Sequence, residues 1–263
     1  MNKTVTIATL VRDRAFILPC FLDYLLQLHY DKKLIHLLWI VNNSTDNSKQ
    51  ILEQFKEKHV HEYHCITIEE INKPYIPKDS RNSYIRNNFT YTHLANLRNY
   101  VLSKIKTDIL FFIDSDILLI DSETLNKLLG HNVDIVGSII YNGYEFDSAA
   151  PHHYTNAMIK DKGIFKHLSL IHIREIQRKG KSLLQPVDLT GAIYCISKKV
   201  IDNKSILYAY HINGEDTPFC EAAKKHGFDI YVDLGCYNQH IMNEKCFELF
   251  LRGKLNDEKN FVL

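Results

Sequence analysis

Two carboxylates one residue apart, Asp114 and Asp116, directly follow the apolar run from Ile109 to Ile113. Because such a run is typical of a buried strand, both side chains would stand at its carboxyl end, with Ser115 between them. Oxygen ligands at the strand ends of an α/β sheet suit a hard divalent cation such as Mn2+ or Mg2+. The pattern therefore favours a metal site.

An ordinary role is the alternative, because Asp and Ser are common turn and cap residues after a strand and Asp-x-Asp often arises by chance. If the metal site is real, its obvious use is to hold a diphosphate. A nucleotide-sugar diphosphate gains negative charge as its bond to the sugar breaks, and a metal ion stabilises that charge as a Lewis acid. The surrounding elements decide between the two interpretations.

The first half of the chain alternates predicted strands and helices. Alternating and β-branched residues predict strands at 4–11, 37–41, 65–68 and 109–113. Helical spacing of apolar residues predicts helices at 16–29, from the turn at 42–46 to about 58, and at 92–104. The polar stretch 69–92 is typical of a surface excursion. This alternation predicts a parallel sheet with helices on both faces.

The second half is less regular. Strands are predicted at 134–140, 187–197 with an interruption at Gly191, and 228–232, with a helix from 243. Another helix should begin with Thr217 as N-cap and Pro218 as its first residue, and end before Gly227. Residues 141–186 form a variable segment rather than a separate domain. Its basic run at 160–181 is interpreted as a solvated helix face, with a lid over the donor as the alternative.

Composition excludes several classes of protein. Lys and Arg total 32 against 31 Asp and Glu, so the net charge of +1 does not suggest nucleic-acid binding. The six cysteines are scattered, which is typical of thiols in a reducing compartment, and the fourteen histidines lack zinc-site spacing. The beginning of the chain does not resemble a signal, and no apolar run approaches a membrane span. We therefore expect a cytoplasmic protein; the oligomeric state is not indicated.

Several motifs in a consistent order resemble those of nucleotide-sugar glycosyltransferases with the GT-A fold, most closely glycosyltransferase family 2. They are the second-strand turn within 40–48, Arg98-Asn99 and the acidic pair within 95–116, Leu189-Thr190-Gly191-Ala192, Gly214-Glu215-Asp216 and His240. The resemblance covers residues 4–240. It implies one Rossmann-like α/β/α sandwich over 1–263. Within it, 1–120 form the donor half, 121–242 the acceptor half and 243–263 a C-terminal helix and tail.

The resemblance also implies roles for individual residues. Asp116 is the preferred direct metal ligand, and Asp114 is expected to contact the ribose or to reach the metal through water. His240 completes the metal site and favours Mn2+ over Mg2+. The donor, a UDP- or GDP-sugar, is expected to contact Thr9, Val11, Arg14, Asn42, Arg98, Asp114 and Ser115. The acceptor hydroxyl is expected beside Gly191 and Glu215.

Asp216 is the candidate general base, with Glu215 as the alternate, and would take the proton of the attacking hydroxyl. The alternative role for Asp216 is that of a helix cap. A plausible base favours inversion at the anomeric carbon, while retention stays open.

Three other functions compete with this interpretation. Sugar-activating nucleotidyltransferases share the sheet but usually carry a glycine-rich loop after the first strand, and the loop from Val11 to Arg14 has no glycine. A dinucleotide-binding dehydrogenase is disfavoured because no Gly-x-Gly-x-x-Gly follows a predicted strand. A catalytically silent nucleotide-sugar-binding module would keep the fold and the motifs, and only turnover distinguishes it from an enzyme.

Overall fold

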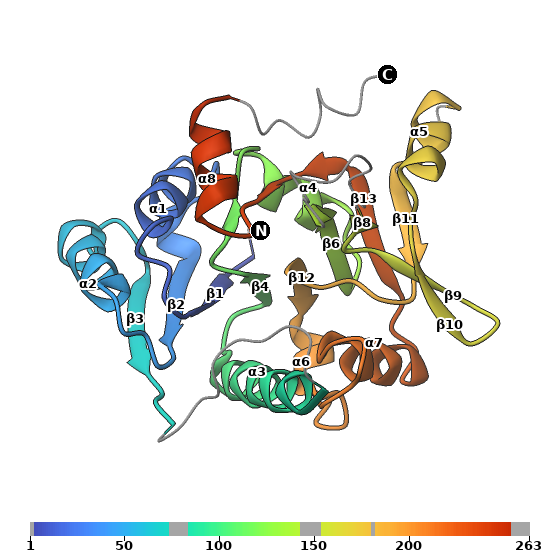
Figure 1. The fold of residues 1–263 in the computed structure, drawn as a ribbon, viewed down its shortest axis with the longest axis horizontal. Coiled ribbons are helices and arrows are strands. Elements are labelled where there is room, and N and C mark those ends of the chain that lie inside the picture. Colours follow the sequence, from blue (N-terminus) through green and yellow to red (C-terminus); the bar gives the residue numbers. More distant parts are fainter. Residues whose placement is uncertain (1–2, 74–83, 143–153, 180–181, 254–263) are drawn as a thin grey trace.

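A computed structural model describes residues 3–73, 84–142, 154–179 and 182–253 of the chain. Its centre is an eight-stranded sheet with helices on both sides (Figure 1). In chain order the strands of this sheet are β1 (Val5–Val11), β2 (Ile35–Val41), β3 (Cys65–Glu70), β4 (Ile109–Ile113), β6 (Ile135–Ile139), β11 (Leu184–Val187), β12 (Ile193–Ser197) and β13 (Ile230–Tyr237).

The strands lie in the order β11-β13-β6-β12-β4-β1-β2-β3. β1 pairs in parallel with β2 and β4, β2 with β3, and β6 with β13. Two strands run against the others: β12 between β4 and β6, and β11 against β13 at one edge. The expected α/β fold with a mostly parallel central sheet is therefore confirmed.

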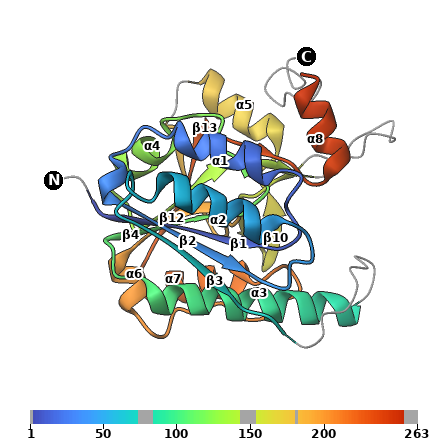
Figure 2. The ribbon, with the colours of Figure 1, turned by 90° about the vertical axis from the view of Figure 1, so that its left-hand side faces the viewer.

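Helices cover both faces of the sheet, and short strand pairs lie at its rim. The helices are α1 (Leu18–Leu26), η1 (Lys32–Leu34), α2 (Ser48–His59), α3 (Tyr84–Lys104), α4 (Thr124–Gly130), α5 (Leu170–Arg178), α6 (Lys198–Asp202), α7 (Asp216–Lys225) and α8 (Glu244–Leu251). The short pairs are β5 (Ile117–Leu118) with β14 (Gln239–His240), β7 (Tyr141–Asn142) with β8 (Tyr154–Thr155), and β9 (Met158–Asp161) with β10 (Ile164–His167). α1, α2 and α4 lie on one face, and α3, α6 and α7 on the other (Figure 2).

The central strand β4 shows why the sheet needs both helix layers. Ile109, Phe111 and Ile113 pack into the core under α1, α2 and α4. Leu110 and Phe112, between them in sequence, pack into the core on the side of α3 and α7. A strand that is buried on both faces has a continuous apolar sequence, and the chain turns polar only where the strand ends. Two acidic residues immediately after β4 must therefore stand at the rim of the sheet.

Most differences from the sequence predictions concern boundaries. α3 begins at Tyr84, although the polar stretch before residue 92 was expected to be irregular; residues 74–83 lie outside the described ranges. The variable segment contains β7 to β11 and α5, while residues 143–153 and 180–181 are not described. The basic run interpreted as a helix face is partly the β9–β10 hairpin and partly α5.

Two predicted elements of the second half needed correction. The single strand predicted at 187–197 is two strands, β11 and β12, which pair with different neighbours. The N-cap position of α7 is Glu215 rather than Thr217, and Asp216 is the first helical residue. Pro218 is tolerated there because N–H groups of the first helical turn have no partner within the helix. Gly227 follows the helix at φ +84°, as predicted for a C-terminal glycine.

Candidate active site

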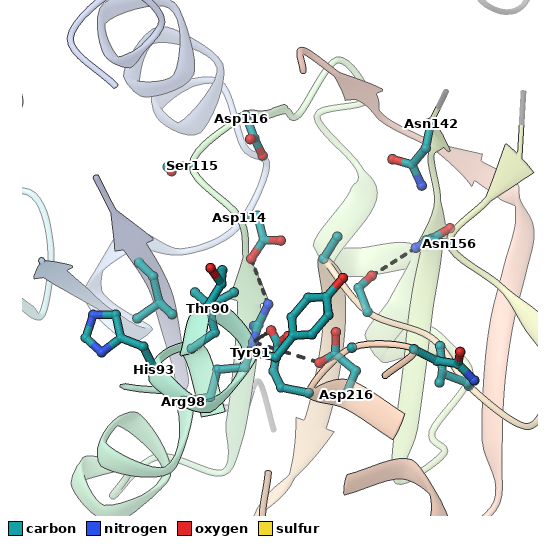
Figure 3. A pocket seen from close by; sticks show the side chains of 18 of the residues that line it. Thr90, Tyr91, His93, Arg98, Asp114, Ser115, Asp116, Asn142, Asn156 and Asp216 are labelled. Carbon is teal, nitrogen blue, oxygen red and sulfur yellow. Dashed lines mark hydrogen bonds and ion pairs between the residues drawn. The ribbon is translucent and has the colours of Figure 1, made fainter. Parts of the chain in front are cut away.

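A cavity of about 920 Å3 opens at the carboxyl edge of the sheet. Its walls come from the loops after β1 and β4, from α3, from the start of β12 and from the first residues of α7. Figure 3 shows how these elements bring Asp114, Asp116, Arg98 and Asp216 around one space. Polar residues that are far apart in sequence thus share one site.

The acidic pair is held by main-chain hydrogen bonds. The N–H of Asp114 donates to the carbonyl of Ala192 at 2.8 Å, where the antiparallel strand β12 is about to begin. The N–H of Ile117 closes a turn onto the carbonyl of Asp114 at 3.0 Å, and the N–H of Ile241 donates to the carbonyl of Asp116 at 2.8 Å. Strand pairing therefore fixes the backbone of both carboxylates on either side.

Arg98 is the central cation of the site. Its side chain is only 3% exposed and reaches Asp114 through Nη2 at 3.0 Å and Glu215 through Nε at 2.9 Å. Nε also lies 3.9 Å from Oδ1 of Asp216, and the guanidinium lies 4.7 Å from the ring centroid of Phe112. Burial opposes the charge of Arg98, but the surrounding carboxylates, Asp216 and Asp114 foremost, keep its pKa above the usual value. One buried charge therefore joins the acidic groups of both halves of the cavity.

Asp216 has the least usual ionisation of the site. Burial raises the pKa of Asp216 to about 7, and Glu215 and Asp114 contribute in the same direction, against the opposing charge of Arg98. Burial likewise raises the pKa of Asp114, again with Arg98 opposing. A carboxylate with a pKa near neutrality can both accept and release a proton at ordinary pH. The environment therefore gives Asp216 the property that a general base requires.

Asp116 has the opposite environment. Its Oδ2 accepts a hydrogen bond from Nη2 of Arg14 at 3.0 Å, and its Oδ1 lies 3.6 Å from Nε2 of His240. Burial opposes ionisation, but the contacts with His240 and Arg14 outweigh it and hold the pKa of Asp116 well below the usual value. His240 is placed there by the β5–β14 ladder, in which it pairs with Ile117.

The donor groups suit a divalent metal in type. Carboxylates from Asp114 and Asp116 and the imidazole of His240 are ligands that Mn2+ accepts. Over the described ranges, however, no three His, Cys, Asp or Glu side chains already form a group that could hold an ion. Arg14 occupies an oxygen of Asp116 instead. Arg14 holds only Oδ2, so an ion would reach Asp116 through Oδ1, beside His240, or displace Arg14 from Oδ2.

The other predicted site residues differ in their distance from the cavity. Arg14, Asn42, Arg98, Ser115, Gly191 and Glu215 line it. Thr9 and Val11 do not, because both side chains are buried within the sheet. The carbonyl of Val11 instead accepts hydrogen bonds from the N–H of Asn42 at 2.9 Å and from its Nδ2 at 3.1 Å. His240 also lies outside the lining and reaches the site through Asp116.

Sequence reasoning missed three residues at the site. His93 on α3 lines the cavity and is buried, and burial lowers the pKa of His93 to about 4. Tyr194 and Tyr208 are buried beneath Asp216. Aromatic residues in a strand or at a helix face ordinarily indicate core, so the sequence carried no signal for these roles.

Comparison with known proteins identifies the family of the chain. A family model described as glycosyltransferase family 25, N-terminal domain, matches residues 2–208. Procollagen galactosyltransferase 1-B of Xenopus laevis is 31% identical over 142 residues, which is 53% of this chain and 23% of that protein. Procollagen galactosyltransferase 2 of Mus musculus is 26% identical over 215 residues, 80% of this chain and 33% of that protein. The chain thus spans about a quarter to a third of the curated relatives that it matches.

Solved structures agree on the fold. A mannosyltransferase from Pyrobaculum calidifontis in complex with GDP-Man and Mn2+ has a TM-score of 0.57 at 12% identity, over 95% of this chain and 60% of that one. TarS of S. aureus in complex with UDP-GlcNAc has a TM-score of 0.54 at 15% identity, over 93% of this chain and 60% of that one.

No helix within the described residues combines the length and apolar character needed to cross a membrane.

The resemblance of the sequence motifs to GT-A nucleotide-sugar glycosyltransferases is confirmed. The matching family model is that of family 25 rather than family 2. On its matched residues and its fold, the chain belongs to glycosyltransferase family 25 and has the GT-A architecture.

Proposed function

We propose that this chain transfers a sugar from a nucleoside diphosphate sugar to an acceptor hydroxyl, with inversion at the anomeric carbon. The observation that carries the proposal is one cavity that is lined by two carboxylates with opposite pKa shifts, Asp116 and Asp216. Asp116 has a lowered pKa and stays charged, whereas the pKa of Asp216 is raised to about 7. The proposed transfer uses both properties: a permanent anion that holds a cation against the diphosphate, and a second carboxylate that accepts the proton of the acceptor hydroxyl.

On the donor side, Arg14 would contact the diphosphate, and the carboxylates after β4 would reach it through a divalent ion. The guanidinium of Arg14 is held by the carbonyls of Arg12 and Asp13 at 3.3 and 3.4 Å, so it is already at the cavity wall. Forked guanidinium groups are well suited to phosphate oxygens. We infer that residues 1–263 work as one domain, with the donor in the half formed by 1–120.

A divalent ion, Mn2+ before Mg2+, would be held by Asp116 and His240, with Asp114 as a further ligand. When bound, such an ion neutralises the charge that develops on the leaving diphosphate. Support comes from the type of the donor groups and from the Mn2+ present with GDP-Man in the Pyrobaculum enzyme. Arg14, paired with Asp116 or displaced from it, would remain within reach of the phosphates.

On the acceptor side, Asp216 would remove the proton of the attacking hydroxyl. Its side chain is 18% exposed and lines the cavity beside Gly191, so a hydroxyl can approach it from the open space. Direct attack on the anomeric carbon from the face opposite the diphosphate inverts its configuration. Glu215 is the weaker candidate because its carboxylate is buried and bonded to Arg98.

The first test is a panel of UDP-, GDP- and dTDP-sugars with and without Mn2+. UDP-galactose belongs in it because the relatives are named galactosyltransferases. We expect one nucleotide to raise the melting temperature only when Mn2+ is present, and its sugar to be released slowly to water. Crystals soaked with Mn2+ and that nucleotide should show the diphosphate beside Asp116. A nucleotide bound elsewhere would refute the assignment.

A silent nucleotide-sugar-binding module is the second candidate. It is favoured by the ion pairs of Arg98 and Arg14, which already engage all four carboxylates of the site within 4 Å. Such a module would show metal-dependent nucleotide binding without sugar release or transfer to any acceptor in a broad set of hydroxyl compounds. The cytoplasmic location expected from the sequence stays a prediction, which fractionation of the native host would test.

A further inference from the structure

Two buried tyrosines lie behind Asp216, outside the lining of the cavity, and are joined to it by hydrogen bonds. Tyr194 on β12 is 0% exposed and Tyr208, before α7, is 2% exposed. We propose that Tyr194 is a positioning residue: its hydroxyl engages Oδ1 of Asp216, so that Oδ2 alone is presented to the acceptor hydroxyl. Tyr208 fixes the direction of that hydrogen bond. This inference rests on the proposed role of Asp216 as the base.

The two oxygens of Asp216 have different surroundings. Oδ1 accepts the hydrogen bond of the Tyr194 hydroxyl at 3.0 Å and lies 3.9 Å from Nε of Arg98. Oδ2 faces the backbone of Gly191, where a side-chain Cβ would collide with it. Gly191 and Asp216 both line the cavity, and among the described residues Oδ2 has no hydrogen-bond partner. The glycine therefore leaves room for the reacting oxygen, and Tyr194 holds the other.

The direction of the hydrogen bonds follows from the number of protons. An ionised carboxylate has no proton to donate, so Tyr194 donates its single hydroxyl proton to Asp216. The hydroxyls of Tyr194 and Tyr208 are 2.5 Å apart. Because the proton of Tyr194 is already used, Tyr208 must donate to the oxygen of Tyr194. Both hydroxyl protons of this hydrogen-bond series thus point toward Asp216, and the series stabilises the ionised form of its carboxylate.

Tyr208 is itself held from two helices. Its main-chain N–H donates to Oδ1 of Asn99 at 2.9 Å, and Nδ2 of Asn99 donates to its carbonyl at 2.8 Å. Its ring stacks on Phe219 of α7, with centroids 4.3 Å apart and planes at 9°. Asn99 follows Arg98 on α3, so neighbouring residues supply the counter-charge of Asp216 and the support of its hydrogen-bond chain.

The groups that face Asp216 from the surrounding elements act in opposite directions. Burial raises its pKa most, and the charges of Glu215 on the same helix and of Asp114 after β4 add to this. Arg98 on α3 and the hydroxyl of Tyr194 on β12 lower it. Loss of the Tyr194 hydroxyl therefore leaves the ionised form less stable.

The test compares Tyr194→Phe and Tyr208→Phe with Tyr63→Phe. Tyr63 is a matched control because it is also buried but lies in the opposite core layer, where its hydroxyl has no partner among the described residues. For Tyr194→Phe we expect kcat to fall roughly tenfold, with the KM for the donor unchanged, because one hydrogen bond to a charged group is lost. The acid limb of kcat/KM should move up by roughly one pH unit. Tyr208→Phe should have smaller effects in the same directions.

A second measurement does not depend on turnover. The 13C shift of the Asp216 carboxyl in aspartate-labelled protein reports its pKa directly, and Asp216→Asn identifies the signal. We expect this pKa to be higher in Tyr194→Phe than in wild type and in Tyr63→Phe. An unchanged pKa, or a lower melting temperature with an unchanged pH profile, would overturn the inference. Full transfer activity in Asp216→Asn would instead refute the proposed function.

Discussion

The two ends of the cavity each carry a pair of acidic residues, and they differ in what surrounds the carboxylates. At the donor end, Asp116 is bonded to Arg14 and lies beside His240, which keeps its pKa well below the usual value. At the acceptor end, Asp216 is buried among other carboxylates and its pKa is raised to about 7. The same type of side chain therefore has a lowered pKa at one end and a raised pKa at the other, which suits the separate roles proposed for them.

Arg98 links the two pairs, because it bonds Asp114 of the first and Glu215 of the second. This sharing explains why neither pair is fully neutralised: one positive charge faces three carboxylates within 4 Å. Division of work between two carboxylates by their environments is a general device of acid–base enzymes. The comparison predicts that substitutions at the two ends affect different measurements.

The largest effect is expected at the acceptor end. Asp216→Asn keeps the size of the side chain but removes the proton acceptor, so transfer should fall by roughly 10²–10⁴-fold. Donor affinity should stay within about twofold of wild type, because Asp216 does not contact the donor end. Initial rates and calorimetric titration of the donor measure the two quantities. Asp161→Asn, on the exposed hairpin strand β9, is the control. If Asp216→Asn lowered donor affinity as much as the transfer rate, the proposal that the two ends of the cavity have separate roles would be wrong.

The shared cation should matter most for stability. Arg98→Met leaves Glu215 and Asp114 without their partner, and breaking a buried ion pair from one side costs about 3–5 kcal/mol of unfolding free energy. Partial exposure of Asp114 favours the lower value. Urea unfolding measures the change, and Arg178→Met on the surface of α5 should stay within about 0.5 kcal/mol of wild type. A change for Arg98→Met no larger than that of the control would show that the carboxylates do not depend on it.

A smaller effect is expected for the metal site. Asp116→Asn weakens the coordinating oxygen and the pairing with Arg14, so donor affinity in Mn2+ should fall by roughly 10–100-fold. With EDTA present, wild type and variant should bind the donor equally weakly. Titration calorimetry in both buffers measures this. Equal donor affinity of the two proteins in Mn2+ would contradict the role assigned to Asp116.

Local patterns predicted the sheet well because its central strands, such as β1 and β4, are buried on both faces and bounded by turns. Strands β1, β3 and β4 lie within two residues of their predicted bounds. The segment 141–186 was not predicted, since strands of two to four residues are stabilised by partners that are distant in sequence. Met158, for example, bonds the backbone of Leu189. The predicted start of α7 was two residues too late. Thr217 followed by Pro218 matches the usual sequence of an N-cap and first helical residue, but the helix has Glu215 at its N-cap position.

Part of the site was predictable for the same reason. Polar residues that follow a buried apolar strand must lie at the rim of the sheet. The sequence alone therefore placed Asp114 and Asp116 there. The pairing of Arg14 with Asp116 spans 102 residues and follows only from the adjacency of β1 and β4. The role of Tyr194 was not predicted, because a tyrosine among the apolar residues of β12 fits the pattern of an ordinary core strand. A buried hydroxyl that orients a carboxylate has the same sequence pattern as an ordinary core tyrosine.

The pH dependence is the finest test of the contrast between the two ends. Because the pKa of Asp216 is raised to about 7, its carboxylate is protonated below that pH and cannot accept the hydroxyl proton. Transfer should therefore fall about tenfold for each pH unit below about 7 and level off above it. Donor binding should not share this midpoint, since the pKa of Asp116 is lowered. Rates and donor titrations from about pH 5 to about pH 9 measure both curves. An acid limb near pH 4, about the ordinary pKa of an aspartate, would mean that burial does not tune Asp216 and that the two ends are alike.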